Sequence, residues 1–447
     1  MNPITVEDLK KILQENGIVG AGGAGFPTYA KIDDRADTLI LNCAECEPLL
    51  KLHRQLLEKN SLAILSALYM ISKIVGAENI IIAVKEEYTE TILSVKEHIG
   101  KFPNMRLEIL NSVYPMGDEI ILTYEVTGKI IPPGSLPIES GITIFNVETI
   151  YNIHQAVNCQ QSVTRKLVSI VGEVSQPITT YIPLGCTIKD AVSMAGEITV
   201  DSSAVIVGGP MMGSVADLSE VITKTTNAIL VLPRDHFLIR TKNRNPNTSL
   251  KRASSACCQC QACTDLCPRH LLGYPIEPHK FMRAACNKDF QNMNSFTDTL
   301  YCSSCGICEM FSCPQSLAPR SLLAVYKSEL AKAGVRPEKK SAYVNEARNY
   351  RKVDEHRLKE RLGLGIYDKN SPLTETDLTI QNVKIPLKQH IGTPATPIVS
   401  VGEKVVLGQT IGMYSKGLSV SVHASLSGIV TEVNHSISIR GCLVSLT

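Results

Sequence analysis

The alternation of apolar and polar positions divides the chain into segments of different character. In residues 1–160, short apolar runs such as TLILN, NIIIAVK and MRLEIL alternate with longer stretches in which apolar residues recur every three or four positions. Short runs of this kind are typical of buried strands, whereas the longer spacing indicates amphipathic helices. Because strands that alternate with helices favour a layered arrangement, we expect an α/β domain over residues 1–160.

Beyond that domain the pattern changes repeatedly. Residues 161–239 hold short β-prone runs and one helical stretch, TIKDAVSMAG, which predict a small α+β unit. Residues 240–256 are polar and basic, and we expect an irregular linker. Residues 257–335 are rich in cysteine, and their last part, PRSLLAVYKSELAKAG, predicts a helix. Residues 336–376 are charged on all sides, which predicts a solvated helical spacer. Residues 377–447 have the β-prone runs and glycine turns of a small barrel or sandwich.

Composition and charge narrow the class of protein. With 447 residues and 44% apolar content, the chain is long enough for several domains with well-buried cores. A formal net charge of +2 argues against electrostatic binding to nucleic acid or to a membrane surface. No stretch has the length of a transmembrane span, and the first residues lack a secretory signal pattern. We therefore expect a soluble, cytoplasmic protein.

Eight of the fifteen cysteines form two groups, and each group ends in Cys-Pro. The first group is Cys257, Cys260, Cys263 and Cys267, and the second is Cys302, Cys305, Cys308 and Cys313. In two-cluster ferredoxins, three cysteines separated by two residues bind one [4Fe–4S] cluster, and the fourth cysteine of the run ligates the other cluster. This rule assigns Cys257, Cys260, Cys263 and Cys313 to one cluster, and Cys267, Cys302, Cys305 and Cys308 to a second.

Two alternatives to this assignment remain open. The first is structural zinc, although zinc sites usually combine two C-x2-C pairs rather than runs of three. The second is that Cys258 replaces Cys257, but this would leave only one residue before Cys260. The four residues between Cys308 and Cys313 also depart from the bacterial ferredoxin spacing of three.

The stretch GIVGAGGAGFPTYAKI raises a separate question, because Gly20, Gly22 and Gly25 fit G-x-G-x-x-G. In a Rossmann fold this motif follows a strand and opens a helix. Here a helical pattern, VEDLKKILQENG, precedes it and Pro27 follows, so the order argues against a Rossmann fold. Such a loop can still present backbone N–H groups to a phosphate, with Lys31 supplying charge. The alternative is a tight connection that binds no ligand.

The first 160 residues contain four motifs in this order: GAGGAGFPTYAKI, NCAECEP, YPMGDE and FNVETIYN. Together they resemble the flavin-binding domain of respiratory complex I and of the C subunit of the Rnf electron-transport complex. The resemblance implies that the glycine loop and the lysine hold the phosphate of FMN, that the acidic segment lies near the flavin, and that NADH stacks on it. Carried over by motif, the cofactor-binding residues are Gly22, Gly23, Gly25, Lys31, Asn42, Glu45, Glu47, Tyr114, Gly117, Glu119 and Asn146. Of these, Glu45, Tyr114 and Glu119 are the expected catalytic residues. Cys43 and Cys46 are expected to be packing residues.

The other segments carry resemblances of their own. Residues 161–239 resemble a soluble-ligand-binding β-grasp domain of SLBB type. Residues 377–447 resemble the barrel-sandwich hybrid of the Rnf C subunit, where that module stands at the N-terminus instead. With the cysteine module, this order resembles the cobalamin reductases of propanediol-utilisation microcompartments. The implied fold is multidomain α/β: an α/β flavin-binding domain, a β-grasp domain, a ferredoxin-like helical module with two [4Fe–4S] clusters, and a barrel-sandwich hybrid.

That family implies an NADH-dependent oxidoreductase that uses FMN and two [4Fe–4S] clusters to reduce cob(II)alamin to cob(I)alamin for coenzyme B12 regeneration. Its implied partners are NADH, a corrinoid, an adenosyltransferase and microcompartment shell proteins, and its implied location is the cytoplasm, inside a microcompartment. Three other functions stay open. The chain could be a soluble electron-transfer subunit such as the proline-reductase-associated protein, a membrane-docked Rnf-type subunit, or a β-grasp ligand-binding or scaffold protein with structural clusters.

Overall fold

The computed structural model describes residues 4–375 and 380–441, and its first domain contains a four-stranded parallel sheet in the order β3-β2-β1-β5. The strands are β1 (Thr38–Cys43), β2 (Asn79–Lys85), β3 (Met105–Leu110) and β5 (Ile142–Asn146). The chain moves outward from β1 to β3 and then returns to add β5 on the other side of β1. Ligands of open α/β sheets bind at such a reversal, outside the carboxyl ends of the strands.

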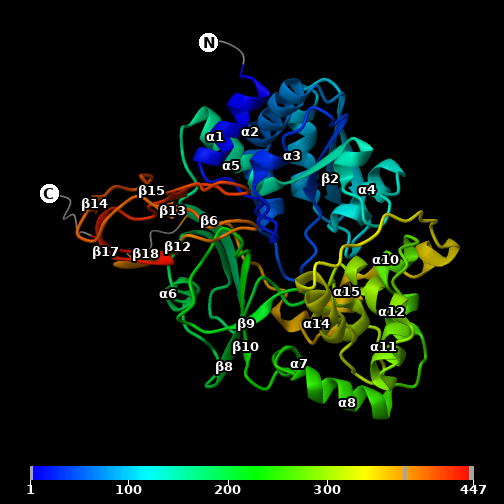
Figure 1. Cartoon of the computed structure of the whole chain (residues 1–447). Helices are drawn as coiled ribbons and strands as arrows, with labels where there is room; N and C mark the ends of the chain where they lie inside the picture. Colours follow the sequence, from blue (N-terminus) through cyan, green and yellow to red (C-terminus); the bar gives the residue numbers. More distant parts are fainter. Residues whose placement is uncertain (1–3, 376–379, 442–447) are drawn as a thin grey trace.

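Both faces of the sheet are buried at β1, β2 and β5, which explains why these strands are mainly apolar, whereas the edge strand β3 is partly exposed and carries Arg106 and Glu108. Leu39 and Leu41 of β1 face one core, whereas Ile40 faces another. Packed into the first core are residues of α1 (Val6–Glu15), α2 (Leu52–Val75), α3 (Thr89–Ile99) and α5 (Val147–Asn158). The second core contains residues of α4 (Glu119–Thr127) and residues from the cysteine module, such as Tyr274. The expected α/β architecture is confirmed, and Figure 1 shows α1, α2, α3 and α5 together at the top.

The next unit is a mixed five-stranded sheet in the order β7-β6-β10-β8-β9. Its elements are β6 (Arg165–Gly172), β7 (Ile178–Pro183), α6 (Ile188–Ser193), β8 (Ser203–Val207), β9 (Ser214–Ala216) and β10 (Ala228–Pro233). Strands β6 and β10 run parallel, and the other pairs are antiparallel. The stretch TIKDAVSMAG contains α6, as its pattern predicted.

The expectation of an irregular linker at residues 240–256 is wrong. The chain forms α7 (Phe237–Lys242) and then α8 (Pro246–Ala256). Asn245 caps α8, because its side chain accepts hydrogen bonds from the N–H groups of Asn247 and Thr248. Pro246 occupies the first turn, where its missing N–H costs nothing. The polar composition therefore belongs to a half-exposed helix.

The cysteine module is helical and compact. Its elements are α9 (Ala262–Asp265), α10 (Pro268–Leu271), α11 (Pro278–Asn287), α12 (Met293–Thr297), η3 (Asp298–Tyr301), α13 (Ile307–Met310) and α14 (Pro319–Lys332). The rings of Phe281, Phe296 and Tyr326 pack against one another, with centroids 5.3 to 6.2 Å apart. This aromatic cluster joins α11, α12 and α14 into one core.

The expectation of a solvated helical spacer at residues 336–376 is also wrong. The segment contains η4 (Glu346–Tyr350), β11 (Val353–Asp354), α15 (Glu355–Arg361) and η5 (Gly365–Tyr367). Arg348 and Glu355 are buried. Strand β11 pairs with β4 (Val113–Tyr114) of the first domain. Some of its charged side chains, such as Arg348 and Lys352, pair with the first domain, whereas others, such as Arg357 and Arg361, are exposed. The expected boundary with the last domain, at residues 376–377, lies outside the described residues.

The last domain consists of two small sheets around a core of its own. One has the order β12-β18-β17-β14 and the other β13-β15-β16. The strands are β12 (Asn382–Pro386), β13 (Thr396–Pro397), β14 (Lys404–Val405), β15 (Thr410–Met413), β16 (Val422–His423), β17 (Gly428–Val433) and β18 (Ser436–Gly441). The expected small barrel-sandwich domain is confirmed.

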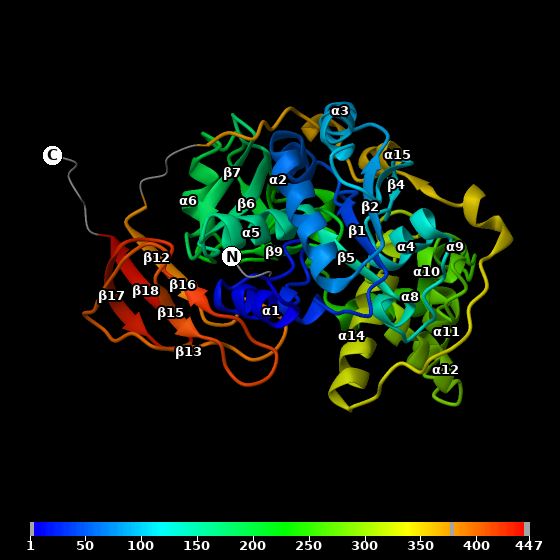
Figure 2. The same ribbon diagram turned by 90° about the horizontal axis from the view of Figure 1, so that it is seen from above.

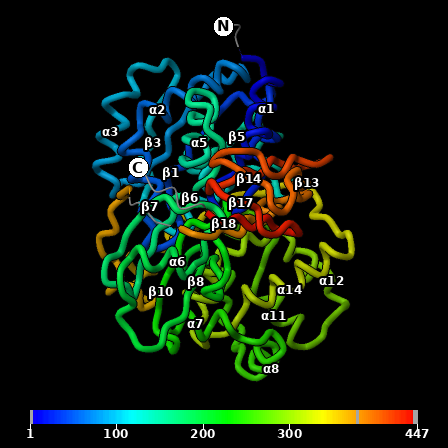
Figure 3. Tube along the Cα trace, turned by 90° about the vertical axis from the view of Figure 1, so that its left-hand side faces the viewer, coloured from blue at the N-terminus to red at the C-terminus, as the bar shows by residue number. Residues whose placement is uncertain are grey.

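This last domain lies beside the first helix of the chain, as Figures 2 and 3 show. The side chain of Gln14 donates a hydrogen bond to the carbonyl oxygen of Ser419, 3.1 Å away. The buried ammonium of Lys224 donates to the carbonyl oxygens of Gly17 and Ser421, at 2.6 and 3.1 Å. Lys224 therefore joins the first, second and last domains. Within the described part of the chain, no helix combines the length and apolarity needed to span a bilayer.

Candidate functional site

Two of the motif residues, Asn42 and Asn146, are register partners at the carboxyl ends of β1 and β5. The side-chain amide of Asn42 donates to the carbonyl oxygen of Gly117 at 2.9 Å. The side-chain oxygen of Asn146 caps α5 by accepting a hydrogen bond from the N–H of Glu148 at 2.9 Å. These bonds fix the loops around the point where the strand order reverses, which is the expected place for a ligand.

The glycine loop lies against this edge of the sheet. The N–H of Ala21 donates to the hydroxyl of Thr149 at 3.0 Å. A Cβ atom on Gly22 would lie 3.4 Å from the side-chain nitrogen of Asn146. Gly23 has a φ of +123°, and its nearest neighbour would be the side chain of Asn227 at 4.0 Å. The space over Gly23 is therefore open, as a loop that cradles a phosphate requires.

Lys31 brings a positive charge to the same edge. Its ammonium lies 2.8 Å from a carboxylate oxygen of Glu119 and donates to the carbonyl oxygen of Ile144 at 3.2 Å. The glycine at position 117 allows a close approach, because a Cβ atom there would lie 2.1 Å from the carbonyl oxygen of Ala44. Gly25 has a similar restriction, since a Cβ atom on it would lie 2.7 Å from Thr225. The glycine loop, the cation and the YPMGDE motif thus meet in one place.

The two cysteines of the NCAECEP motif are packed inside the domain. Cys43 is 1% exposed. The sulfur of Cys46 accepts a hydrogen bond from the N–H of Gly117 at 2.8 Å. Burial raises the pKa of the Cys46 thiol to about 12, so this group is neutral at physiological pH. A buried neutral thiol suits a packing role better than a redox role.

The acidic side chains of that motif are also held tightly. Glu45 is buried and accepts a hydrogen bond from the N–H of His53 at 2.8 Å, at the start of α2. Glu47 accepts hydrogen bonds from the N–H groups of Met211 and Met212, both at 2.7 Å. Burial raises the pKa of Glu47, although these hydrogen bonds oppose the rise. Glu47 therefore ties a loop of the second domain to the edge of the first.

Sequence reasoning missed a buried polar network beside the glycine loop. The ring nitrogen Nε2 of His53 is buried without a hydrogen-bond partner, 3.6 Å from a carboxylate oxygen of Glu148. The ammonium of Lys166 pairs with Glu148 and donates to the side-chain oxygen of Asn227 at 2.6 Å. The network also reaches Asn146, whose side-chain nitrogen lies 3.3 Å from Nδ1 of His53. No local sequence pattern marks His53, Lys166 and Asn227, because the residues of the network lie far apart in the chain.

The eight cysteines of the two motifs line two chambers. One is bordered by Cys257, Cys260, Cys263 and Cys313, with Cys258 also at its wall. The other is bordered by Cys267, Cys302, Cys305 and Cys308. The structure thus brings together the two sets that the spacing predicts. Four thiols around one chamber form a donor set that fits an iron–sulfur cluster.

The two chambers differ in their surroundings. Cys267, Cys305 and Cys308 are buried, whereas Cys258 and Cys260 are exposed. We therefore call the chamber of Cys305 the inner chamber and that of Cys260 the outer chamber. Burial raises the pKa of both Cys263 and Cys267 to about 12, with the neighbouring thiols adding to the shift. Binding of iron to these sulfurs must therefore release protons.

The inner chamber touches the flavin-type motifs directly. The hydroxyl of Tyr114 donates a hydrogen bond to the carbonyl oxygen of Cys305 at 2.5 Å. The guanidinium of Arg269, two residues after Cys267, donates to both carboxylate oxygens of Asp118 at 2.9 and 2.8 Å. Sequence reasoning missed this pair, although Asp118 lies inside the YPMGDE motif and Arg269 follows the Cys-Pro pair.

Family models cover most of the chain. Residues 13–155 match the Nuo51 FMN-binding domain, and residues 167–215 match the SLBB domain. Residues 256–318 match the 4Fe-4S dicluster domain, and residues 367–444 match the RnfC barrel sandwich hybrid domain. The four folds expected from the sequence are confirmed, and the matches support FMN and iron–sulfur clusters as cofactors.

Individual relatives show the same combination. The chain is 38% identical over 429 residues to the cobalamin reductase PduS of Citrobacter freundii, covering 96% of this chain and 95% of that protein. It is 35% identical over 433 residues to the PduS of Salmonella typhimurium, covering 96% of each chain. The chain is 30% identical to the C subunit of the Na(+)-translocating ferredoxin:NAD(+) oxidoreductase complex of Acetobacterium woodii, and the match covers 60% of each chain. A crystal structure of an NAD+-reducing [NiFe]-hydrogenase in the H2-reduced state shares the fold at a TM-score of 0.50, with 19% identity, covering 74% of this chain and 63% of the hydrogenase chain.

Proposed function

Because the chain belongs to the PduS cobalamin reductase family and is therefore an oxidoreductase, we propose that it reduces cob(II)alamin to cob(I)alamin with electrons from NADH. A bound flavin exchanges electron pairs with a nicotinamide and single electrons with iron–sulfur clusters, which is the chemistry this reaction requires. The product would serve coenzyme B12 regeneration. The proposed partners are NADH, a corrinoid, an adenosyltransferase and the shell proteins of a cytoplasmic microcompartment.

In this proposal each group of motif residues has a role in binding or in electron transfer. Gly22, Gly23 and Gly25 expose backbone N–H groups to the FMN phosphate, and Lys31 supplies the opposing charge. Asn42, Gly117 and Asn146 shape the edge of the sheet. Glu45, Tyr114 and Glu119 are the proposed catalytic residues, and Glu47 holds the second domain against them. The eight motif cysteines would hold the two clusters.

The observation that carries the proposal is the contact between Tyr114 and Cys305. It links the flavin-type motifs to the inner chamber through one hydrogen bond. The surrounding side chains, among them Leu49, Met211 and Ile307, are buried and apolar, so water is kept out of this contact. The outer chamber has exposed cysteines at its wall, which suits exchange of electrons with an acceptor.

An anaerobic assay tests this proposal. Protein loaded with FMN and iron is mixed with NADH, cob(II)alamin and an adenosyltransferase, and adenosylcobalamin is measured. We expect adenosylcobalamin to form, and to form far more slowly in variants that lose either cluster. Rapid NADH oxidation with an artificial dye, but none with cob(II)alamin, would contradict cobalamin as acceptor. A repeat with NADPH gives the coenzyme preference.

A second candidate is a soluble electron-transfer protein that passes electrons from NADH to another acceptor. It is favoured by the 30% identity to an Rnf-type C subunit over 60% of the chain. The dye result above is the outcome that this candidate predicts.

A further inference from the structure

Residues 338–355, which we call the strap, run between the first domain and the cysteine module. Figure 2 shows this yellow segment along the outer edge of the molecule before it reaches α15. On the side of the cysteine module, the hydroxyl of Tyr301 donates to the carbonyl oxygen of Glu338 at 2.7 Å. The N–H of Asn345 donates to the carbonyl oxygen of Leu271 at 3.0 Å.

Charged side chains hold the strap to the same module. The ammonium of Lys340 lies 3.2 Å from a carboxylate oxygen of Asp298. The guanidinium of Arg351 lies 2.9 Å from a carboxylate oxygen of Asp265, in the short helix α9. Asp265 lies two residues after Cys263 and two before Cys267, so this contact is close to both cysteine groups in sequence.

The other side of the strap is attached to the first domain. The N–H of Lys340 donates to the carbonyl oxygen of Pro133 at 3.1 Å. Farther along, Val353 is paired with Tyr114 in the antiparallel ladder of β11 and β4. The buried ammonium of Lys85, at the end of β2, pairs with Glu355. Attachments to the two modules therefore alternate along the strap.

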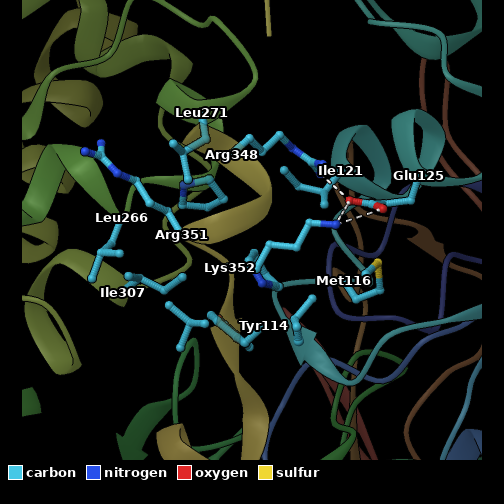
Figure 4. Close-up of a pocket in the computed structure, with 14 residues that line it drawn as sticks. Tyr114, Met116, Ile121, Glu125, Leu266, Leu271, Ile307, Arg348, Arg351 and Lys352 are labelled. Carbon is cyan, nitrogen blue, oxygen red and sulfur yellow. Dashed lines mark hydrogen bonds and ion pairs between the residues drawn. The ribbon is translucent and has the colours of Figure 1, made fainter. Parts of the chain in front are cut away.

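Glu125 of α4 is the centre of this attachment, as Figure 4 shows. Its carboxylate pairs with Arg348 and lies 2.9 Å from the ammonium of Lys352. Burial alone would raise the pKa of Glu125, but hydrogen bonds from Lys352 and Arg348 outweigh burial, and the pKa is lowered. The guanidinium of Arg348 also stacks over the ring of Tyr124, 4.7 Å from its centroid. One carboxylate thus holds two cations of the strap.

Beneath these charges lies a pocket with apolar walls. Its lining includes Tyr114 and Met116 of the first domain, and Leu266 and Ile307 of the cysteine module. Figure 4 shows the strap residues Arg348, Arg351 and Lys352 beside it. Tyr114 is the residue that contacts Cys305, and Ile307 lies between Cys305 and Cys308. The strap therefore covers the seam at which the first domain meets the inner chamber.

We propose that the strap, anchored by Glu125 through Arg348 and Lys352, fixes the distance between the flavin domain and the inner chamber and seals the seam against water. Glu125, Arg348 and Lys352 are positioning residues in this role. The inference rests on the proposed function, in which electrons cross this seam. Because electron transfer slows steeply with distance, a seam that opens slightly would lower the rate without changing any group that binds NADH.

The test compares Glu125→Gln and Lys352→Gln with Lys359→Gln. Lys359 is a matched control, because its ammonium also pairs with a carboxylate, that of Asp368, but outside the strap. The side chains of Lys352 and Lys359 are 18% and 17% exposed, so the substitutions are equally buried. In anaerobic stopped-flow experiments with NADH, flavin bleaching and cluster bleaching are followed separately. Amide hydrogen exchange of residues 113–114 and 353–354 reports the pairing of β4 and β11 without any turnover.

We expect faster amide exchange at β4 and β11 in Glu125→Gln and Lys352→Gln, together with cluster bleaching slowed severalfold, because electron transfer slows as the distance grows. Flavin bleaching should keep its rate, and Lys359→Gln should match the unmodified protein in every respect.

Two results would overturn the inference. Unchanged exchange in Glu125→Gln would show that this carboxylate does not anchor the strap. Faster exchange with an unchanged rate of cluster bleaching would show that the strap does not control the seam. Failure of NADH to bleach the flavin of the unmodified protein is a different outcome, because it contradicts the proposed function, while the exchange data still decide whether Glu125 is the anchor.

Discussion

The hydroxyl of Tyr114 donates a hydrogen bond to the backbone carbonyl of Cys305, and both residues are buried. One belongs to the YPMGDE motif of the first domain, and the other lies in the second cysteine group. Burial raises the pKa of Tyr114 well above its usual range, so the hydroxyl keeps its proton and remains a donor. The contact makes the electronic surroundings of the inner chamber depend on a residue of the flavin domain.

Replacement of Tyr114 by Phe removes this donor and leaves the Cys305 carbonyl unpaired. We expect the free energy of unfolding to fall by about 1–3 kcal/mol. FMN and iron contents should persist, but the EPR signal of the inner cluster should shift, because hydrogen bonding around the ligands tunes a cluster.

Tyr274→Phe provides the control for this prediction. The Tyr274 hydroxyl donates to the carbonyl oxygen of Ile131 at 2.8 Å, also across the two modules but not to a motif cysteine. This variant should lose similar stability without any change in the EPR signal. Equal EPR spectra for all three proteins would contradict a role of Tyr114 at the cluster.

Substitutions in the glycine loop should remove the flavin and leave the iron. Gly23→Val places a side chain in the open space over the loop and strains a backbone with a φ of +123°. Lys31→Glu reverses the charge that faces the phosphate. We expect both proteins to purify with little FMN and with unchanged iron, measured by absorbance and by metal analysis.

Gly76→Val separates backbone strain from ligand contact. Gly76 also has a positive φ, +80°, and a Cβ atom there would touch nothing within 4 Å. This variant should be destabilised and yet keep its flavin. Full FMN content in both Gly23→Val and Lys31→Glu would show that the loop is not the phosphate site.

Cysteine substitutions test how the ligands are divided. The unmodified protein should hold about eight irons with matching acid-labile sulfide, and Cys263→Ala should reduce this to about four. One reduced-state EPR signal should disappear and the other remain. Cys258→Ala should retain both signals, since Cys258 is only the alternative ligand. Stoichiometric zinc without visible charge-transfer absorption would contradict the iron–sulfur assignment.

Between about pH 7 and 8, Lys224 should make the stability of the fold rise with pH. Burial lowers the pKa of its ammonium to about 7, whereas a lysine in the unfolded chain titrates near 10.4. Between these values the unfolded chain binds more protons, so the free energy of unfolding rises by up to about 1.4 kcal/mol per pH unit. Below pH 7 both states are protonated and this contribution is constant.

Chemical denaturation at a series of pH values measures this rise. In Lys224→Met the rise between pH 7 and 8 should vanish, because the group whose pKa differs between the folded and unfolded chain in this interval has been removed. An identical slope in the variant would contradict the assignment to Lys224.

The two sets of cysteines could be predicted because the spacing between the ligands of one cluster is visible within a short stretch of sequence. Cys257, Cys260 and Cys263 lie within seven consecutive residues, and only the exchange of Cys267 and Cys313 depends on the fold. The order of elements around the glycine loop could also be predicted, since Val6–Glu15 has helical periodicity and forms the helix α1 that precedes the loop. Such patterns can be interpreted from neighbouring residues alone, because they do not depend on contacts with distant parts of the chain.

Charged residues with distant partners could not be placed in the same way. Arg348 looks like part of a solvated surface, and its partner Glu125 lies 223 positions earlier in the chain. The partners of Glu47 are backbone N–H groups, which any sequence offers at every position except proline. Helix α8 is a different case, because Asn245-Pro246 is a readable N-terminal signal that the polar composition obscured.

The last domain lies beside α1, although the two are far apart in the sequence (Figures 2 and 3). Gln14 of α1 contacts Ser419 of the barrel-sandwich module, 405 positions later in the chain. A gene rearrangement that placed the module ahead of α1 would preserve this contact wherever a linker spans the gap, because the contact depends on the fold and not on the order of the segments along the chain.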